Sequence, residues 1–207
     1  MRLYNCERKA EDGLGCSLVI VQADSVNQPV LLTPGEHDYF VSLQSDERKI
    51  EWLRSRRAMK QVLATLHQDC DTSKLLFPHR QFSVTHAGDL AFAIGNAANQ
   101  AGIGVDYEPL RNVTPNVARW FLNTSEKCWI GSKVKTNDHL IRLWTIKESA
   151  FKSFPHNAGM ALLDFAIMNP QDNICYVTIT GHTHCVTVIC EQYKNGYLSI
   201  ATCKETQ

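Results

Sequence analysis

The sequence predicts an α+β protein made of two similar α/β halves in one chain. Its 207 residues are 44% hydrophobic and 20% charged, a composition typical of a globular protein rather than a disordered one. A chain of this length can bury a core without the help of a disulfide or a metal. A strand, a long helix and a hairpin are expected in this order on each side of the small polar segment Asn96–Gln100. We therefore place the halves at residues 1–98 and 99–207, with a ligand-binding cleft between them.

In the first half, the longest helix is indicated by its apolar periodicity. Over Asp46–His67, apolar residues recur at helical spacing, at Met59, Val62, Leu63 and Leu66. Thr33-Pro34 predicts an earlier helix start, because threonine caps helices and proline fits their first turn. A strand and the two arms of a hairpin are expected at Leu14–Gln22, Phe82–Thr85 and Leu90–Ile94.

The second half repeats this order with more elements. Gly102–Glu108 predicts a strand, and helices should begin at Thr114-Pro115 and at Thr124-Ser125-Glu126. Asp138 is expected to cap an amphipathic helix that runs to about Phe154. The rest of the chain favours strands, at Leu162–Met168, Cys175–Thr180, Cys185–Cys190 and Tyr197–Cys203.

Charge and hydropathy argue against several functional classes. The 21 Lys and Arg balance the 21 Asp and Glu, which argues against binding of nucleic acid through bulk positive charge. No apolar run approaches the roughly 20 residues of a membrane span. The charged start of the chain lacks the apolar stretch of a signal peptide. We therefore expect a soluble cytoplasmic protein that binds neither nucleic acid nor membrane.

The eight cysteines follow no recognisable metal or disulfide pattern. No Cys-x-x-Cys pair occurs, so reduced thiols are expected. His182-Thr-His184-Cys185 groups three potential zinc ligands, but on a strand Cys185 would point away from the two histidines. Zinc binding is the minor interpretation of this cluster.

Asp106 and Glu108 form the first candidate site. They are separated by one residue in a predicted strand, so both carboxylates should share a face while Tyr107 points to the other. Two like charges held this close either face water or share a cation. The glycines Gly102 and Gly104 before them are typical of a strand that another backbone or a ligand approaches closely.

The second candidate site is Trp144-Thr-Ile-Lys147-Glu148-Ser-Ala-Phe-Lys152 on the predicted long helix. Glu148 and Lys152 are four residues apart, a spacing that also suits a simple surface ion pair. In the first half, the long helix carries a row of basic residues that includes Arg48 and Arg56, and a solvated helix face explains that row equally well.

Together these motifs resemble the 4′-phosphopantetheinyl transferase family. Gly-Ile-Gly-Val-Asp106-Tyr-Glu108 followed about 40 residues later by Trp144-Thr-x-Lys147-Glu148-Ser-x-x-Lys152 is similar to its two signature motifs, with Tyr107 in place of an aliphatic residue. Three further segments resemble family elements in the same order, at Glu51–Arg56, Phe82–His86 and Arg119–Glu126. The length and the two halves resemble the larger, surfactin-synthetase-activating type, which is similar to a pseudo-dimer in one chain with the active site at the interface.

The resemblance implies a reaction and a set of site residues. A Mg²⁺-dependent enzyme of this family moves the 4′-phosphopantetheine arm of coenzyme A to a serine of an apo acyl or peptidyl carrier protein and releases adenosine 3′,5′-bisphosphate. Asp106, Glu108 and Glu148 would hold the metal, and Glu148 and Lys152 would act in catalysis. We expect a monomer whose contacts to coenzyme A come from Arg48, Arg56, Thr85, His86, Lys147 and Lys152.

Two other functions remain open from the residues alone. An Asp-x-Glu pair with a distant glutamate also suits a magnesium-dependent nuclease or nucleotidyl transferase. A module that binds coenzyme A or a carrier protein without catalysis is the non-enzymatic alternative.

A docking surface for the acidic carrier protein is expected between the two signature motifs. There we expect Phe121 in the core and Trp129 as an exposed anchor, with basic neighbours that steer association, at Lys127, Lys133 and Lys135.

Overall fold

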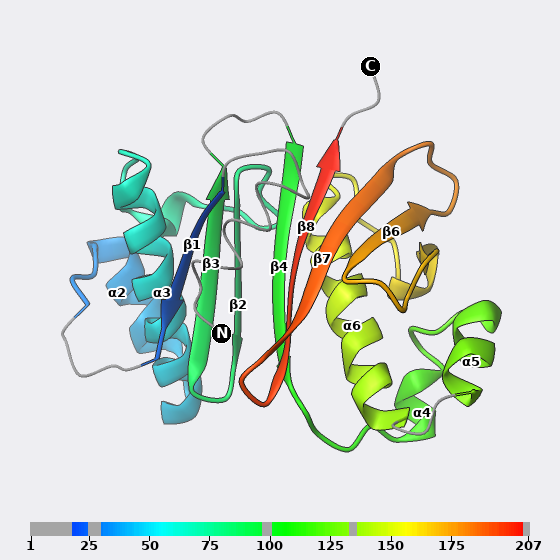
Figure 1. Cartoon of the computed structure of the whole chain (residues 1–207). Coiled ribbons are helices and arrows are strands. Elements are labelled where there is room, and N and C mark those ends of the chain that lie inside the picture. The colour runs from blue at the N-terminus through cyan, green and yellow to red at the C-terminus, as the bar shows by residue number, and fades with distance from the viewer. Residues whose placement is uncertain (1–17, 25–29, 97–100, 133–135, 205–207) are drawn as a thin grey trace.

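The computed structural model describes residues 18–24, 30–96, 101–132 and 136–204, and these form two antiparallel sheets with helices outside them (Figure 1). The mixed α+β class expected from the sequence is confirmed. The predicted linker Asn96–Gln100 lies, after Asn96, outside the described residues.

The first sheet has the strand order β1-β3-β2, and α3 packs against it. Thr33 caps α2 as predicted, through a hydrogen bond from the Glu36 N–H to its side chain and a reciprocal bond from its own N–H to the Glu36 carboxylate. The buried face of α3 includes Met59, Val62 and Leu63, as the periodicity predicts. The elements are β1 (Leu18–Ala23), α2 (Pro34–Ser42), α3 (Asp46–Thr65), the 3₁₀ turn η1 (Thr72–Lys74), β2 (Phe82–Ala87) and β3 (Leu90–Asn96).

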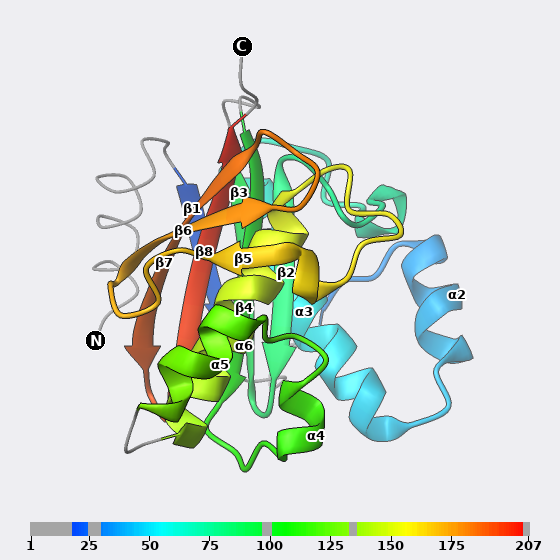
Figure 2. The same cartoon turned by 90° about the vertical axis from the view of Figure 1, so that its right-hand side faces the viewer.

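The second sheet has the order β4-β8-β7-β6-β5, and α6 packs across it with α5 and α4 near its N-terminal end (Figure 2). Its elements are β4 (Ala101–Pro109), α4 (Pro115–Ala118), α5 (Thr124–Gly131), α6 (Thr136–Ser153), the 3₁₀ turn η2 (Leu162–Asp164), β5 (Phe165–Ile167), β6 (Ile174–Ile179), β7 (Cys185–Tyr193) and β8 (Gly196–Lys204).

Two details of the second half differ from the sequence prediction. The long helix begins at Thr136, so Asp138 lies in its first turn and is not the cap. The helix α5 begins at Thr124 as predicted, and Asn123 caps it, because its side chain accepts the Glu126 N–H and completes a capping box. The segment expected as one strand from Leu162 begins with the turn η2. Capping geometry depends on backbone dihedrals, which sequence patterns locate only to within a few residues.

The two halves share a topology. In each half, the first strand pairs antiparallel with the last strand: β1 with β3, and β4 with β8. The other edge of that last strand pairs with the strand just before it in the chain: β2 with β3, and β7 with β8. In each, the long helix covers one face of the sheet. The pseudo-dimer arrangement and the domain boundary at residue 98 remain predictions.

The faces of the sheets turned away from the helices pack on each other. A buried cluster joins β1 and β3 of the first sheet to β4, β7 and β8 of the second. At its centre the Tyr107 ring lies 5.2 Å from the Phe92 ring and 6.3 Å from the Tyr193 ring. This core brings β2 alongside β4: the Val105 N–H donates to Ser83 Oγ at 3.0 Å. The helix, sheet, sheet, helix order therefore places residues from both halves at one seam (Figure 1).

No helix within the described ranges is long and apolar enough to cross a membrane.

The contact between β4 and α6 gives a stability prediction. A Cβ atom on Gly104 would lie 1.9 Å from the Ser149 carbonyl oxygen, which is backbone and cannot move aside cheaply. Gly104→Ala should lower the free energy of unfolding by about 3 kcal/mol, near the upper end of overpacking costs. Gly131→Ala is the control, because nothing lies within 4 Å of its added Cβ and alanine favours helix over glycine. Urea denaturation measures both, and equal stability of the two variants would contradict the packing argument.

Candidate active site

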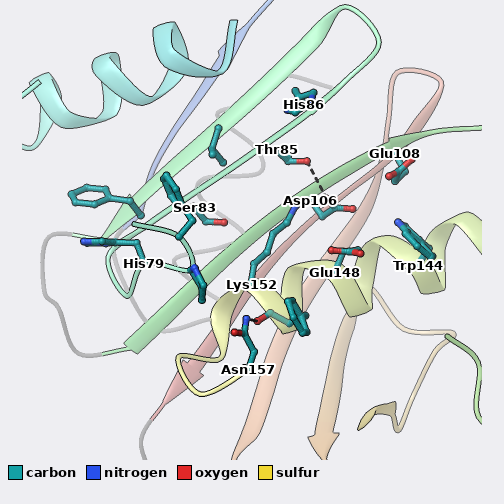
Figure 3. A pocket seen from close by; sticks show the side chains of 15 residues that line it. His79, Ser83, Thr85, His86, Asp106, Glu108, Trp144, Glu148, Lys152 and Asn157 are labelled. Carbon is teal, nitrogen blue, oxygen red and sulfur yellow. Dashed lines mark hydrogen bonds and ion pairs between the residues drawn. The ribbon is translucent and has the colours of Figure 1, made fainter. Parts of the chain in front are cut away.

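A cavity of about 590 Å³ lies where β2 meets β4 and α6 (Figure 3). Its walls come from both halves of the chain: β2 and the segment before it on one side, β4 and α6 on the other. The predicted residues that line it are Thr85, His86, Asp106, Glu108, Glu148 and Lys152. The structure thus brings together side chains from three separate sequence motifs.

Asp106 is the most enclosed carboxylate of the cavity, with only 4% of its surface exposed. Its Oδ1 atom accepts hydrogen bonds from Thr85 Oγ1 at 3.0 Å and from Lys152 Nζ at 2.7 Å. Its Oδ2 atom is buried and has no hydrogen-bond partner. An unpaired buried carboxylate oxygen is costly, so its position in a cavity wall indicates that a bound group completes the site.

Glu108 and Glu148 add two carboxylates near Asp106 (Figure 3). Burial raises the pKa of Glu148 above its ordinary value, and the charges of Asp106 and Glu108 raise it further, while Lys152 opposes them. Burial and the charge of Asp106 also raise the pKa of Glu108, against Arg111, whose guanidinium lies 3.3 Å from the Glu108 carboxylate. The cavity therefore holds more negative charge than its own cations neutralise.

These residues fit a hard divalent cation. Mg²⁺ prefers a few carboxylate oxygens plus phosphate and water. Asp106 Oδ2 has no hydrogen-bond partner, and burial together with the neighbouring carboxylates raises the pKa of Glu108 and of Glu148. As the side chains stand, no group of three or more His, Cys, Asp or Glu within the described parts of the chain is arranged to hold a metal. The Lys152 ammonium is the cation that contacts Asp106 in this arrangement.

His86 and Thr85 both line the cavity but differ in exposure. The Thr85 hydroxyl is buried and donates to Asp106, so it orients that carboxylate. The His86 side chain is 47% exposed, with Nε2 3.4 Å from a Glu51 carboxylate oxygen and Nδ1 3.4 Å from Ser55 Oγ. Glu51 and Ser55, both on α3, are thus partners of His86 that sequence reasoning did not identify as such.

Arg48 and Arg56 line a smaller cavity of about 190 Å³, which shares Val84 and His86 with the larger one. Arg48 is exposed at its rim. The Arg56 guanidinium lies 5.0 Å from the centre of the Trp52 ring. Burial lowers the pKa of Arg56, and the nearby Glu36 opposes that shift. The two arginines therefore lie beside the carboxylate cavity rather than in its wall.

The structure corrects the prediction for Lys147. Its side chain is fully buried on the face of α6 that turns away from the cavity, and its Nζ atom lies 2.8 Å from the Glu126 carboxylate. Burial lowers the pKa of Lys147, while Glu126 opposes the shift. A contact between Lys147 and coenzyme A is therefore wrong for this arrangement, because the ammonium is inside the core with its own counter-ion.

The cavity is also lined by residues to which the sequence analysis gave no role of their own. Trp144 was seen only as part of the second motif, yet its indole lines the wall one turn before Glu148. The segment before β2 closes the other end, where the His79 ring stacks on Phe82 at 4.9 Å. Burial lowers the pKa of His79. Further lining residues are Phe77, Pro78, Ser83, Val84, Phe151 and Asn157.

Of the aromatic residues expected near the docking surface, Trp120 is exposed and Trp129 is not. Phe121 is buried as expected. Trp129 is only partly exposed and contacts the His139 ring at 4.9 Å, so the expectation of an exposed anchor there is wrong. Trp120 is the exposed aromatic, with 66% of its surface accessible and the Arg119 guanidinium over its ring. Lys133 and Lys135 lie outside the described residues.

In the cluster His182-Thr-His184-Cys185, the two histidines make aromatic contacts. The rings of His182 and His184 lie 4.9 and 5.5 Å from the Phe154 ring. Cys185 is exposed, and no cysteine in the described ranges forms a disulfide.

The fold and the cavity define an α+β protein with a carboxylate-lined site at the seam of two sheets. Residues 102–203 match the family model of the 4′-phosphopantetheinyl transferase superfamily. The chain is 29% identical over 107 residues to the 4′-phosphopantetheinyl transferase ffp of Bacillus subtilis, across 51% of this chain and 46% of that protein. The part of the chain that carries β4, α6 and the three carboxylates belongs to this superfamily.

A solved structure is also similar to part of the chain. The holo-acyl-carrier-protein synthase AcpS of Thermotoga maritima matches with a TM-score of 0.44 and 15% identity, over 51% of this chain and 64% of that one. The chain thus covers less than two thirds of the length of either relative.

The raised pKa of Glu148 predicts a pH-dependent stability. Because the folded state holds this proton more tightly than the unfolded state, stability should fall as pH rises from the unfolded pKa through the folded one. Glu148→Gln removes the penalty, so in EDTA it should raise the melting temperature at pH 7.5 and leave it unchanged at pH 4. Glu47→Gln is the matched control: Glu47 is exposed in the first turn of α3, where losing the charge brings no gain. A melting temperature of Glu148→Gln that equals the wild type at pH 7.5 would contradict the burial penalty.

Proposed function

We propose that this protein transfers the 4′-phosphopantetheine arm of coenzyme A to a serine of an apo acyl or peptidyl carrier protein, with Mg²⁺, and releases adenosine 3′,5′-bisphosphate. We also propose that it acts as a single chain of the larger, two-half type. The observation that carries the proposal is the cavity in which Asp106, Glu108, Glu148 and Lys152 meet residues of β2. Membership of the superfamily supports it independently.

The carboxylates and the ammonium group of the cavity are suited to a reaction at the pyrophosphate of coenzyme A. The transferred phosphoryl group carries several negative charges, so catalysis depends on neutralising and orienting them. Bound Mg²⁺, held by Asp106, Glu108 and Glu148, would supply that neutralisation and a fixed geometry for the phosphate oxygens. Lys152 lies beside Asp106, where its ammonium reaches the same region and can contact a phosphate directly.

Glu148 is the best-placed general base in the cavity. Its pKa is raised by burial and by two neighbouring carboxylates, which increases its affinity for the proton of the attacking serine hydroxyl. Lys152, one turn later on α6, opposes that shift. His86, exposed at the junction of the two cavities, and the two arginines are suited to the other phosphates of coenzyme A.

A transfer assay tests the proposal. The protein is incubated with coenzyme A, Mg²⁺ and a panel of apo carrier proteins, and mass spectrometry follows the gain of one phosphopantetheine. The wild type should modify at least one carrier. Asp106→Asn and Glu148→Ala should each lower kcat/KM at least about 100-fold, the scale of losing a preorganised electrostatic contact, while circular dichroism shows them folded.

The alternatives give different results in the same experiment. A non-catalytic module would bind coenzyme A and leave the carriers unmodified. A nuclease or nucleotidyl transferase would act on nucleic acid with the same dependence on Asp106. Glu47→Gln, at an exposed residue that lines neither cavity, should transfer like the wild type.

The smaller cavity predicts a separable contribution to coenzyme A binding. Arg48→Ala should raise the KM for coenzyme A about tenfold with little change in kcat, because a phosphate held equally in ground and transition states affects binding alone. Dephospho-coenzyme A, which lacks the 3′-phosphate, should show no such change. Lys49→Ala is the control, since Lys49 directly follows Arg48 on α3, lines neither cavity and pairs with Asp46 at 3.9 Å. An equal rise in KM for coenzyme A and dephospho-coenzyme A would contradict a contact between Arg48 and the 3′-phosphate.

A further inference from the structure

Lys147 and Glu126 form an ion pair that neither cavity touches. Their side chains are 0% and 1% exposed, and Nζ lies 2.8 Å from Oε2. The same ammonium donates to the backbone carbonyl oxygens of Phe121 at 2.6 Å and Leu162 at 3.2 Å. A lysine has three N–H donors, so every one of them has an acceptor.

Glu126 is equally saturated. Its Oε2 atom accepts the Asn123 N–H at 2.9 Å, and its Oε1 atom accepts the Ile167 N–H at 3.0 Å. The pair therefore fixes the middle of α6 to α5 and the residues just before it, to the first residue of η2 and to β5. These are the elements that pack on the side of α6 away from the cavity.

The position of Lys147 on α6 links this network to the cavity. Trp144, Glu148 and Lys152 follow one another at four-residue spacing, and all three line the cavity wall (Figure 3). Lys147 directly precedes Glu148, and neighbouring residues on a helix point about 100° apart. A helix held by Lys147 on one side is thus fixed in rotation and in axial position on the other.

Energetics favour a geometric role over a purely stabilising one. A buried ion pair gains little net stability, because desolvation of both charges offsets their attraction. What the pair supplies beyond apolar packing is direction, since five charge-assisted contacts converge on two side chains.

We infer that Lys147 is a positioning residue of the transferase: through Glu126 it sets the rotation of α6 that aims the Glu148 carboxylate into the cavity, where the proposed metal and the serine hydroxyl would bind. This inference rests on the proposed function. It assigns Lys147 no contact with coenzyme A, the metal or the carrier protein.

The test compares two buried cations of the same helix. Arg142 is also buried on α6, and its guanidinium is bound by backbone carbonyls of Pro170, Asp172 and Cys190, away from the cavity. Lys147→Met and Arg142→Met should both lower the melting temperature, so Arg142→Met controls for general destabilisation. Assays at a temperature where both variants are folded give kcat, the KM for coenzyme A and the Mg²⁺ concentration for half-maximal rate.

Lys147→Met should lower kcat about 30-fold and raise the Mg²⁺ concentration for half-maximal rate several-fold. The KM for coenzyme A should stay within about threefold of the wild type. The reason is that a misplaced Glu148 carboxylate affects the reacting centre and not the binding of coenzyme A. The additional rise in melting temperature that Mg²⁺ gives in the presence of coenzyme A should shrink in parallel, which is a readout free of turnover. Arg142→Met should change each of these by less than about threefold.

Glu126→Gln keeps the size of the side chain and removes its charge, so it serves if Lys147→Met does not fold. It should shift kcat and the Mg²⁺ dependence in the same direction by a smaller factor. The double variant Lys147→Met/Glu126→Gln should melt higher than the sum of the single losses implies, because no unpaired buried charge remains.

Kinetics of Lys147→Met equal to those of Arg142→Met would overturn the inference, and so would a large rise in the KM for coenzyme A with kcat unchanged. A wild-type protein that transfers no phosphopantetheine would instead refute the proposed function. The two failures give different results, because the inference is tested only by comparing variants with an active wild type.

Discussion

The site depends on the close approach of β4 to α6. Cβ atoms at Gly102 and Gly104 would lie 2.0 and 1.9 Å from the backbone carbonyl oxygens of Ser153 and Ser149, so only glycine allows the helix to lie this close to the strand. The strand then continues with Asp106 on the same face, where period-two alternation points the carboxylate along the side of α6. The 2.7 Å contact between Lys152 and Asp106 follows from that spacing. A wider gap between strand and helix would separate the acid from the cation.

The core between the two sheets provides the other side of the site. Because β2 is held beside β4, its Thr85 hydroxyl reaches Asp106 and its His86 imidazole reaches the rim. The aromatic contacts around Tyr107 are buried on the opposite face of β4, which explains how a tyrosine is accommodated where the family motif has an aliphatic residue: its ring fills the inter-sheet core and its hydroxyl donates to Asn195 Oδ1 at 3.1 Å. Alternate residues of β4 thus build the core and the cavity.

What the sequence predicted was governed by local periodicity. The shared face of Asp106 and Glu108 follows from strand alternation, and the alignment of Glu148 with Lys152 follows from the helical repeat. Lys147 was assigned to coenzyme A from its place in the second motif, but its partner Glu126 lies 21 positions earlier on another helix, where no periodicity connects the two. Trp129 was misplaced for a similar reason: its basic and small neighbours in sequence indicated exposure, but its ring packs on His139. Long-range pairing and packing decided both cases.

The balanced composition of the chain conceals a local separation of charge. In total, 21 basic residues oppose 21 acidic ones, which argues against a polyanionic partner when the chain is taken as a whole. In the structure, the second half supplies the three cavity carboxylates, whereas His86, Arg48 and Arg56 of the first half lie at the junction and in the smaller cavity beside it. Under the proposed function, a ligand with several phosphates would match such a site better than a uniform polyanion, because the carboxylate end would accept it together with a divalent cation while the other end would bind phosphate directly. Selectivity for a small, multiply phosphorylated molecule can therefore arise from the order of charges along the seam, with no net positive charge on the protein.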